Sequence, residues 1–314
     1  MMLHVDHIQE IVQKFLTFDA QIMPETRFAI NLRKNLRVVK KRALVIWICL
    51  IANCVIYMLI PLLSPGRHLP EDLYILYGLE PMLESPNYEI QYVVFIISSG
   101  FCIYVMVNVA VYVIVIVGYI EAHLHTLSEE LKILWDDSQN FYNEVKHKIH
   151  NKIHAIHQKE NIENDYIRKR LNSIVHYHAT NIQLLREFNN EISQTLIVEY
   201  SIMVFAIITI LLGGLENTYR QLPFVVVQIF INCLSGQRLI DACDEFENAV
   251  YSCEWENFNA SNQKIVLLML LISQKTLMLS AGGVADLNFI CLMTILKSSY
   301  STYTTLESTV KNNT

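Results

Sequence analysis

The run from Ile90 to Ile120 contains no charged residue, and it constrains the fold of this chain more than any other feature does. A membrane-spanning helix needs about 20 predominantly apolar residues. This run is longer than the hydrocarbon layer needs, so it predicts a helix that tilts within the membrane or continues beyond it. Of the 314 residues, 53% are hydrophobic and only 17% are charged, whereas soluble domains average about 25% charged residues. The sequence therefore predicts an all-α membrane protein.

Other apolar runs have the same character but differ in length. Ala43–Leu63 carries no charge and is long enough to cross a membrane. Tyr200–Leu215 and the run that returns from Gln221 are shorter, and we expect each of them to cross as well. Lys264–Leu279 and Leu287–Leu306 are each interrupted by a lysine. Hydropathy alone leaves open whether these last two runs are separate crossings.

A basic cluster lies directly before the first apolar run. Residues 1–42 form an amphipathic segment that ends in this cluster, which contains no acidic residue: Arg33, Lys34, Arg37, Lys40, Lys41 and Arg42. Lysine and arginine beside a span mark its cytoplasmic side. The loop Ser64–Glu89, in contrast, is acidic and rich in proline, which suits an extracellular lid. We therefore expect the first run to cross from the cytoplasm outward.

The stretch from Glu121 to Glu199 is polar and holds neither proline nor glycine, so it predicts cytoplasmic helix between two spans. Most of the 11 histidines lie in it: His123, His125, His147, His150, His154, His157, His176 and His178. His150 and His154 are one helical turn apart, a spacing that could hold zinc or copper. However, the chain contains neither a His-x-x-His-His nor a His-Glu-x-x-His motif. We interpret the histidines as a solvated, weakly pH-responsive helix face and expect no metal and no cofactor.

Three classes of function suit such a protein: a ligand-gated channel subunit, a secondary transporter and a membrane enzyme. No Gly-x-Ser-x-Gly motif and no phosphate-binding glycine loop occurs, so only the histidines support an enzyme. We expect Ser235-Gly236 and Gly282-Gly283 to lie at helix ends or in turns. A transporter is expected to show internal repeats with matching broken spans, and none is visible. No basic stretch alternates with aromatic residues, which argues against nucleic-acid binding. The seven cysteines are odd in number and include no Cys-x-x-Cys pair, which favours reduced, apolar side chains.

The last part of the chain carries short motifs in a distinctive order. They are Cys233-Leu-Ser-Gly236-Gln-Arg-Leu239, Tyr251-Ser-Cys-Glu-Trp255 and Ala281-Gly282, followed by a helix that closes with Ile295-Leu-Lys297-Ser-Ser-Tyr300-Ser. Their order and spacing resemble the C-terminal signature of the insect odorant receptors, a family of seven-span ligand-gated channels. Gustatory receptors are the near alternative, but their last helix typically carries a Thr-Tyr motif ending in Gln-Phe. This chain reads Ser301-Thr-Tyr-Thr-Thr-Leu-Glu307 there, which favours an odorant receptor.

The resemblance implies an all-α, polytopic transmembrane fold with about five spans and a cytoplasmic anchor helix. The implied spans are 43–63, 90–120, about 192–215, 221–240 and 286–308. The chain would then begin with a cytoplasmic amphipathic and basic segment, residues 1–42. Transmembrane ligand-binding helices would follow in residues 43–240, and they include a cytoplasmic helical extension at about 121–191. A cytoplasmic anchor-helix region (241–285) and a final pore-lining span with an extracellular C-terminus (286–314) would complete the chain. Because the family has seven spans and a cytoplasmic N-terminus, we expect two further spans to precede Met1.

The resemblance also implies a function. We expect an odorant receptor subunit of the plasma membrane, not an enzyme, that forms a volatile-ligand-gated cation channel with a shared co-receptor for olfactory sensory transduction. A tuning receptor fits better than the co-receptor itself, which carries a long cytoplasmic insertion. The expected partners are the co-receptor in a hetero-oligomer, most simply a tetramer, a small volatile apolar ligand and the lipid bilayer. The alternatives are a gustatory-type channel and, with less support, a metal-dependent membrane enzyme or a transporter.

Family analogy places the ligand among the outer halves of several spans. The candidate ligand-binding residues are Val55, Ile56, Leu59, Tyr92, Val93, Ile96, Ile97, Tyr219 and Leu222.

A stripe of hydroxyl side chains follows in the last apolar run. Thr294, Ser298, Ser301 and Thr305 recur at steps of four, three and four, so they share one helical face. Such a stripe packs closely against another helix or lines a wet path for ions. The resemblance favours the path, with Thr309 continuing it toward the outer end of the pore.

Overall fold

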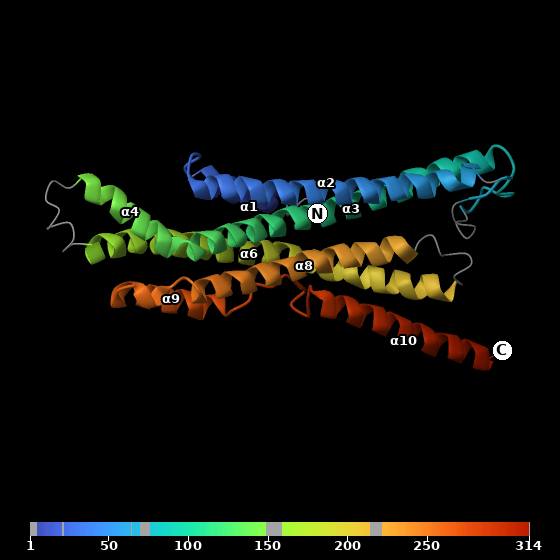
Figure 1. Ribbon diagram of the computed structural model, residues 1–314. Coiled ribbons are helices and arrows are strands. Elements are labelled where there is room, and N and C mark those ends of the chain that lie inside the picture. The colour runs from blue at the N-terminus through green and yellow to red at the C-terminus, as the bar shows by residue number, and fades with distance from the viewer. Residues whose placement is uncertain are drawn as a thin grey trace. The chain divides into compact units, whose positions relative to one another are not determined.

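The computed structural model describes residues 5–20, 22–63, 65–69, 76–148, 159–213 and 222–313, and they are almost entirely helical (Figure 1). The helices are α1 (Val5–Ala20), α2 (Arg27–Leu63), α3 (Asn87–Lys132), α4 (Leu134–Lys148), α6 (Lys159–Leu212), α8 (Leu222–Tyr251), α9 (Ala260–Ser273) and α10 (Phe289–Asn313). A 3-10 turn, η2 (Trp255–Asn257), precedes α9. Two short strands, β1 (Ser280–Ala281) and β2 (Ala285–Asp286), lie between α9 and α10. The predicted all-α class is confirmed.

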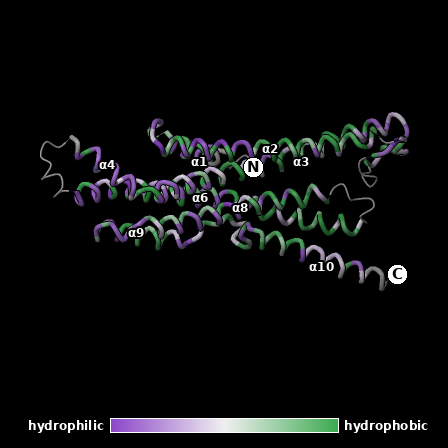
Figure 2. Tube along the Cα trace, in the orientation of Figure 1, coloured by the Kyte–Doolittle hydropathy of each residue, from purple (hydrophilic) through white to green (hydrophobic). Residues whose placement is uncertain are grey.

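Four helices in the described part of the chain are long and apolar enough to cross a membrane: α2, α3, α6 and Leu222–Asn257, which contains α8. Figure 2 shows long hydrophobic stretches within these helices. Four of the five predicted spans therefore fall in helices of the expected type, and the chain is a multi-pass membrane protein. The fifth predicted span forms a helix, α10, but Lys297 and its many hydroxyl residues keep it out of this group. Its crossing stays a prediction.

The chain packs as two compact units. Unit 1 consists of Met1–Val39, Ile116–Tyr200 and Cys233–Cys291, and unit 2 of Lys40–Val115, Ser201–Asn232 and Leu292–Thr314. Each unit is therefore assembled from segments that lie far apart in the sequence. Helices α2, α3, α6 and α8 each contribute residues to both units.

Unit 2 has an aliphatic core made by three of the long helices. Ala43 and Leu50 of α2 pack with Val107 and Ile114 of α3 and with Ile231 of α8. Partly buried residues surround this core: Ile46, Trp47, Ile51, Ile103, Val111 and Phe224. The Tyr92 hydroxyl also donates a hydrogen bond to the Met58 carbonyl oxygen at 2.6 Å, which ties α3 to α2. This hydrogen bond and the apolar core hold α2, α3 and α8 together. Neighbouring turns of these helices line the cavity described below.

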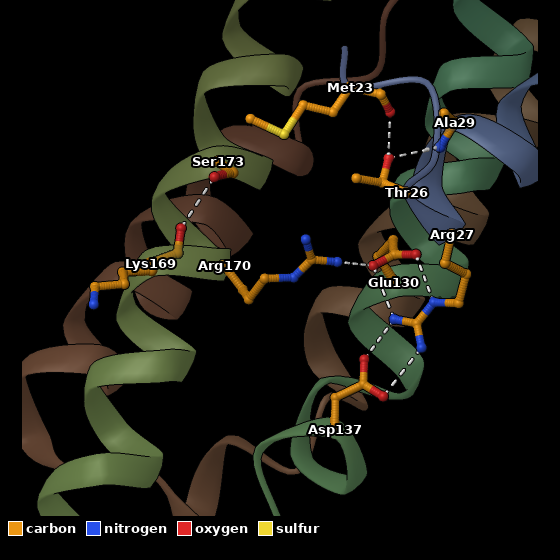
Figure 3. Close-up of polar contacts among 9 residues, drawn as sticks. All are labelled: Met23, Thr26, Arg27, Ala29, Glu130, Asp137, Lys169, Arg170 and Ser173. Atoms are coloured by element: carbon orange, nitrogen blue, oxygen red, sulfur yellow. Dashed lines mark hydrogen bonds and ion pairs between the residues drawn. The ribbon is translucent and has the colours of Figure 1, made fainter. Parts of the chain in front are cut away.

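Unit 1 contains a buried carboxylate held by two arginines (Figure 3). The Glu130 side chain is 1% exposed, and Arg27 donates to both of its oxygens at 3.0 Å, while Arg170 donates from α6. Arg27 also donates to Asp137 at 2.5 and 3.0 Å. Hydrogen bonds to Asp137 and Glu130 raise the pKa of Arg27. Because a buried charge is tolerated when it is paired and hydrogen-bonded, this network joins the start of α2 to α3, α4 and α6.

A small hairpin connects α9 to α10 within unit 1. β1 and β2 pair antiparallel, and the turn between them has Gly282 and Gly283 at φ +62° and +67°, a conformation that side chains rarely adopt. Asn189 of α6 holds the hairpin, because its Oδ1 accepts from the Ser280 N–H at 2.9 Å and its Nδ2 donates to the Ser280 hydroxyl at 3.2 Å. The Gly282 N–H donates to the Ser193 carbonyl oxygen at 3.0 Å. The Gly282-Gly283 pair is a turn, as its sequence predicts.

Gly236 corrects the sequence interpretation. A helix-end or turn role is the expectation for Ser235-Gly236, but α8 runs unbroken from Leu222 to Tyr251. A Cβ atom on Gly236 would lie 2.0 Å from the Leu287 carbonyl oxygen. The glycine is therefore explained by a close approach of α8 to the chain just ahead of α10, and the hydropathy of the region gives no sign of this contact.

Candidate ligand pocket

Unit 2 contains a cavity of about 270 Å³ between parts of four helices, and it is open to the surface. The lining residues come from α2, α3, α6 and α8: Asn53, Cys54, Tyr57, Phe95, Ser99, Ile103, Ala206, Thr209, Ile210, Phe224 and Val225. Ile103 and Phe224 also pack against the aliphatic core, so the cavity borders that core. Pockets for drug-sized ligands span about 300–1,000 Å³, so this one suits small molecules.

Helical spacing explains why these residues meet. Phe95, Ser99 and Ile103 follow one another at steps of four on α3, so they project from one face. Thr209 lies three residues after Ala206 on α6, so these two residues also project from one face of their helix. Each helix therefore contributes one face to the cavity wall.

The chemistry of the wall is apolar with a few polar groups. The Ser99 hydroxyl donates to the Phe95 carbonyl oxygen at 2.6 Å, and the Thr209 hydroxyl donates to the Ala206 carbonyl oxygen at 2.9 Å. Because these hydroxyl hydrogens are used within their own helices, the two oxygens can still accept a hydrogen bond from a ligand. Asn53 brings an amide that can both donate and accept. The cavity can thus hold a small, mostly apolar molecule and orient it through one or two hydrogen bonds.

Among the described residues, none of the ligand-binding residues predicted from the sequence lines this cavity. On α2, Val55, Ile56 and Leu59 are exposed, and Ile56 is 60% exposed. They occupy a different face from Asn53, Cys54 and Tyr57, which line the cavity from the same helix.

The remaining predicted residues divide among α3, α8 and a region outside the described residues. On α3, Val93 and Ile97 are exposed and Ile96 is half-buried. Tyr92 is buried one turn from Phe95, where its hydroxyl bonds to α2. Leu222 is half-buried at the start of α8, two residues before Phe224, and Tyr219 lies outside the described residues. The role of these residues in ligand binding therefore stays a prediction.

One signal in the sequence points to the lining residues. Asn53, Ser99 and Thr209 are polar residues within long apolar runs, where polar side chains are costly unless they face protein or water. The apolar residues of the cavity wall give no such signal, because apolar residues occupy every face of these apolar runs.

The predicted pore-lining residues share an open face of α10. Thr294, Ser298, Ser301, Thr305 and Thr309 are all exposed in the single chain. The Thr305 hydroxyl donates to the Ser301 carbonyl oxygen and the Thr309 hydroxyl to the Thr305 carbonyl oxygen, both at 2.9 Å. The hydroxyl hydrogens of Thr305 and Thr309 are therefore used within their own helix, and their oxygens remain available as acceptors on its exposed face.

Two of the histidines depart from the expected solvated face. His123 is fully buried, with Phe18 stacked on its ring at 5.4 Å and Tyr119 at 4.5 Å. His178 is buried and stacks on Phe246 at 4.4 Å. Burial lowers the pKa of His178 to about 4, so its ring is neutral near pH 7. The interpretation as solvated side chains is wrong for these two, because packing between helices is not visible in local composition.

The other histidines behave differently. His125 contacts Glu245 at 2.6 Å and His176 is exposed. Within the described ranges, no group of three or more histidine, cysteine or acidic side chains is arranged to hold a metal ion. His150, His154 and His157 lie outside those ranges, as does the side chain of His147.

Solved structures share this fold. The insect olfactory receptor OR5 from Machilis hrabei matches with a TM-score of 0.67 and 12% sequence identity, over 87% of this chain and 68% of that receptor. A second structure of the same receptor, in complex with eugenol, matches with a TM-score of 0.67 and 11% identity, over 88% and 69% of the two chains. At these identities the likeness establishes the fold alone.

Sequence comparison finds curated relatives. Odorant receptor 67a of Drosophila melanogaster is 28% identical over 154 residues, which are 46% of this chain and 37% of that receptor. Odorant receptor 30a of the same species is 24% identical over 274 residues, 81% of this chain and 63% of that receptor. The matched regions thus span less than two thirds of these relatives.

The sequence profile of one family covers nearly the whole chain. The family is described as 7tm Odorant receptor, and its profile matches residues 1–300, which include the cavity, the hairpin and the first part of α10. Together with the shared helical fold, this match establishes that the chain belongs to the 7tm Odorant receptor family.

Proposed function

We propose that this protein is an odorant receptor subunit whose unit 2 cavity binds a small volatile molecule. The observation that carries the proposal is the cavity of about 270 Å³, walled mostly by apolar and aromatic side chains, with Asn53, Ser99 and Thr209 among its polar groups. A volatile molecule is small and mostly apolar, so it gains from leaving water and needs few hydrogen bonds. Family membership supports the same conclusion.

Binding would open a cation channel formed with a shared co-receptor. The hydroxyl face of α10 supports this part of the proposal, because Ser301 and Thr305 are exposed and offer oxygens toward a path for ions. In this arrangement the face is covered by water within the pore rather than by lipid.

Assembly would use α9, the helix that the sequence resemblance identifies as a cytoplasmic anchor. Leu267, Leu268 and Leu271 on α9 are exposed in the single chain. Exposed leucines grouped on one helix are typical of a surface that another protein covers. Contact with neighbouring subunits through α9 would bring the α10 helices of the oligomer around a common axis.

Co-expression with a co-receptor tests the proposal. The receptor is produced from its full message in cells that also express the co-receptor, and calcium imaging follows responses to a panel of small volatile compounds. We expect at least one compound to raise calcium only when both subunits are present. A receptor that reaches the cell surface with the co-receptor, yet answers neither this panel nor a panel of tastants, would contradict the proposal. A response to tastants alone would favour the gustatory-type alternative.

A further inference from the structure

The cytoplasmic end predicted for α2 carries a face of exposed cations. Arg33, Lys34, Arg37, Lys40 and Lys41 are all exposed. No acidic residue occurs anywhere in α2, from Arg27 to Leu63. The charges on this face are therefore all positive over a little more than two turns of helix.

The cations gather on one side of the helix. With about 100° of rotation per residue, the five positions fall within an arc of about 120°. Leu32, Val39 and Ala43 are buried and lie on the other side of the helix. Burial of that apolar stripe fixes the rotation of α2, so the cationic arc has to point away from the packed helices.

These five cations are not used to hold the fold. Arg27, on the same helix, is paired with Glu130 and Asp137. Among the residues that the structure describes, none of the five forms a salt bridge with an acidic side chain. The unpaired charges thus leave the face ready for an anionic partner.

The same arc continues into an apolar face. Leu44 and Ile48 follow on it within two turns and are 53% and 50% exposed. Exposed apolar side chains within an uncharged run are typical of a lipid-facing surface. The cationic arc therefore ends where the hydrocarbon begins, which places its last residues at the depth of the lipid headgroups.

The length of the arc indicates the kind of headgroup. At about 1.5 Å per residue, Arg33 and Lys41 are about 12 Å apart along the helix. The headgroup layer is only about 5–8 Å thick on each side of the membrane. The cations therefore extend beyond the plane of ordinary lipid phosphates, so they match a headgroup that carries further phosphates on a projecting ring.

We propose that this cationic arc of α2 binds a polyphosphorylated inositol lipid of the cytoplasmic leaflet. The lipid tails would lie beside Leu44 and Ile48, and the ring phosphates would meet the cations one to two turns earlier. A basic cluster next to a span attracts anionic lipids electrostatically. The proposal rests on the cytoplasmic location of this end of α2, which is part of the predicted topology.

Lipid binding to the purified receptor tests this directly. The protein is placed in nanodiscs of phosphatidylcholine and titrated with fluorescent dioctanoyl phosphatidylinositol 4,5-bisphosphate, and anisotropy gives the Kd at about 0.1 M salt. Both membrane faces are accessible in a nanodisc, so the orientation of insertion does not affect the result. We expect replacement of all five cations by glutamine (R33Q/K34Q/R37Q/K40Q/K41Q) to weaken binding at least tenfold.

Two matched variants separate the site from net charge. R168Q/K169Q/R186Q/K264Q/K275Q also removes five exposed cations, none of them on α2, and is expected to change the Kd less than twofold. R33K/R37K keeps the charge and is expected to retain binding. An equal loss in the off-site variant, wild-type affinity in the α2 variant, or equal competition by phosphatidylserine vesicles at matched total charge would overturn the proposal. Because no odorant, co-receptor or current is involved, failure of the proposed receptor function would leave this result unaffected.

Discussion

At the scale of single residues, Gly236 shows how one absent side chain sets the distance between two segments. A Cβ atom there would lie 2.0 Å from the Leu287 carbonyl oxygen and 2.9 Å from its carbonyl carbon. Backbone atoms cannot move aside as a side-chain tip can, so Gly236→Ala is expected to separate α8 from the start of α10. Overpacking of this kind costs about 1–3 kcal/mol. Thermal unfolding of the detergent-purified protein should therefore show a lower Tm.

A matched substitution controls for the change of residue type. Gly100 is also helical, but a Cβ atom there would meet only the flexible Met58 Cε, at 3.3 Å. Gly100→Ala should leave Tm unchanged or raise it, since alanine favours helix by about 1 kcal/mol over glycine. An equal loss of stability in both variants would mean that the Leu287 contact is not responsible.

His178 makes a prediction about pH. Its pKa is lowered to about 4 by burial against Phe246, and it lies outside the predicted spans. Between about pH 6.5 and pH 4 the unfolded chain binds a proton that the folded chain does not, so stability falls as pH falls through this window. At about pH 5 the free energy of unfolding is expected to be about 2 kcal/mol lower than it is well above pH 6.5. His178→Phe removes the titrating group and should flatten the decline in Tm between pH 7 and pH 5.

The exposed His176, two residues away, provides the comparison. His176→Phe should keep the wild-type dependence of Tm on pH. If His178→Phe and the wild type lose stability in parallel, the buried ring at 178 is not the group that responds.

At the scale of secondary-structure elements, α10 makes a prediction about conduction. Ser301 and Thr305 lie on its exposed hydroxyl face, whereas Leu296 is half-buried. In a pore, an added carboxylate at the hydroxyl face would attract cations and change selectivity or block. We expect Ser301→Asp and Thr305→Asp to alter these properties of the heteromeric channel, measured by whole-cell recording. Leu296→Asp should instead reduce assembly. If the first two variants reach the surface with unchanged selectivity and blocker sensitivity, the stripe is a packing surface.

Hydropathy predicts the elements well because a membrane helix needs a long apolar run and little else. The runs at Ala43–Leu63 and Ile90–Ile120 lie within α2 and α3, and the glycine pair at Gly282 forms a turn. These features follow from local composition and backbone conformation, which the sequence contains directly.

The face that each helix turns toward the cavity could not be predicted in the same way. In α2 and α3, apolar residues occupy every side of the helix, so periodicity does not distinguish the side that packs from the side that meets lipid. The structure selects Tyr57 and Phe95 for the cavity and leaves Ile56 exposed. Long-range contacts such as Gly236 with Leu287 and His178 with Phe246 were beyond prediction for the same reason, since they depend on which helices are neighbours.

At the scale of the whole molecule, the number of crossings fixes the side of the C-terminus. A cytoplasmic start and five crossings put Thr314 outside the cell, whereas four crossings would put it inside. Two further spans ahead of Met1 would not change this outcome, because they add an even number. An epitope tag after Thr314 should be stained by antibody on intact cells. A tag before Met1, on the same chain, should be stained only after permeabilisation.

Staining of the Thr314 tag only in permeabilised cells would contradict a fifth crossing. In that case α10 would not span, and its hydroxyl face could not line a transmembrane pore in the proposed way. Staining of the tag before Met1 on intact cells would instead place the basic cluster outside.

The most direct test of the central claim, that the unit 2 cavity is the odorant site, is the response of cavity-filling variants to ligands of graded size. Ala206→Phe and Ser99→Leu add volume inside the cavity, and Ile56→Phe adds it on an exposed face of α2. With surface expression matched, concentration–response curves are recorded for an active compound and its shorter and longer homologues. We predict that the two cavity variants lose the longer homologues first, with EC50 raised at least tenfold, while Ile56→Phe keeps the wild-type order. Unchanged curves for Ala206→Phe and Ser99→Leu, with altered curves for Ile56→Phe, would contradict the account.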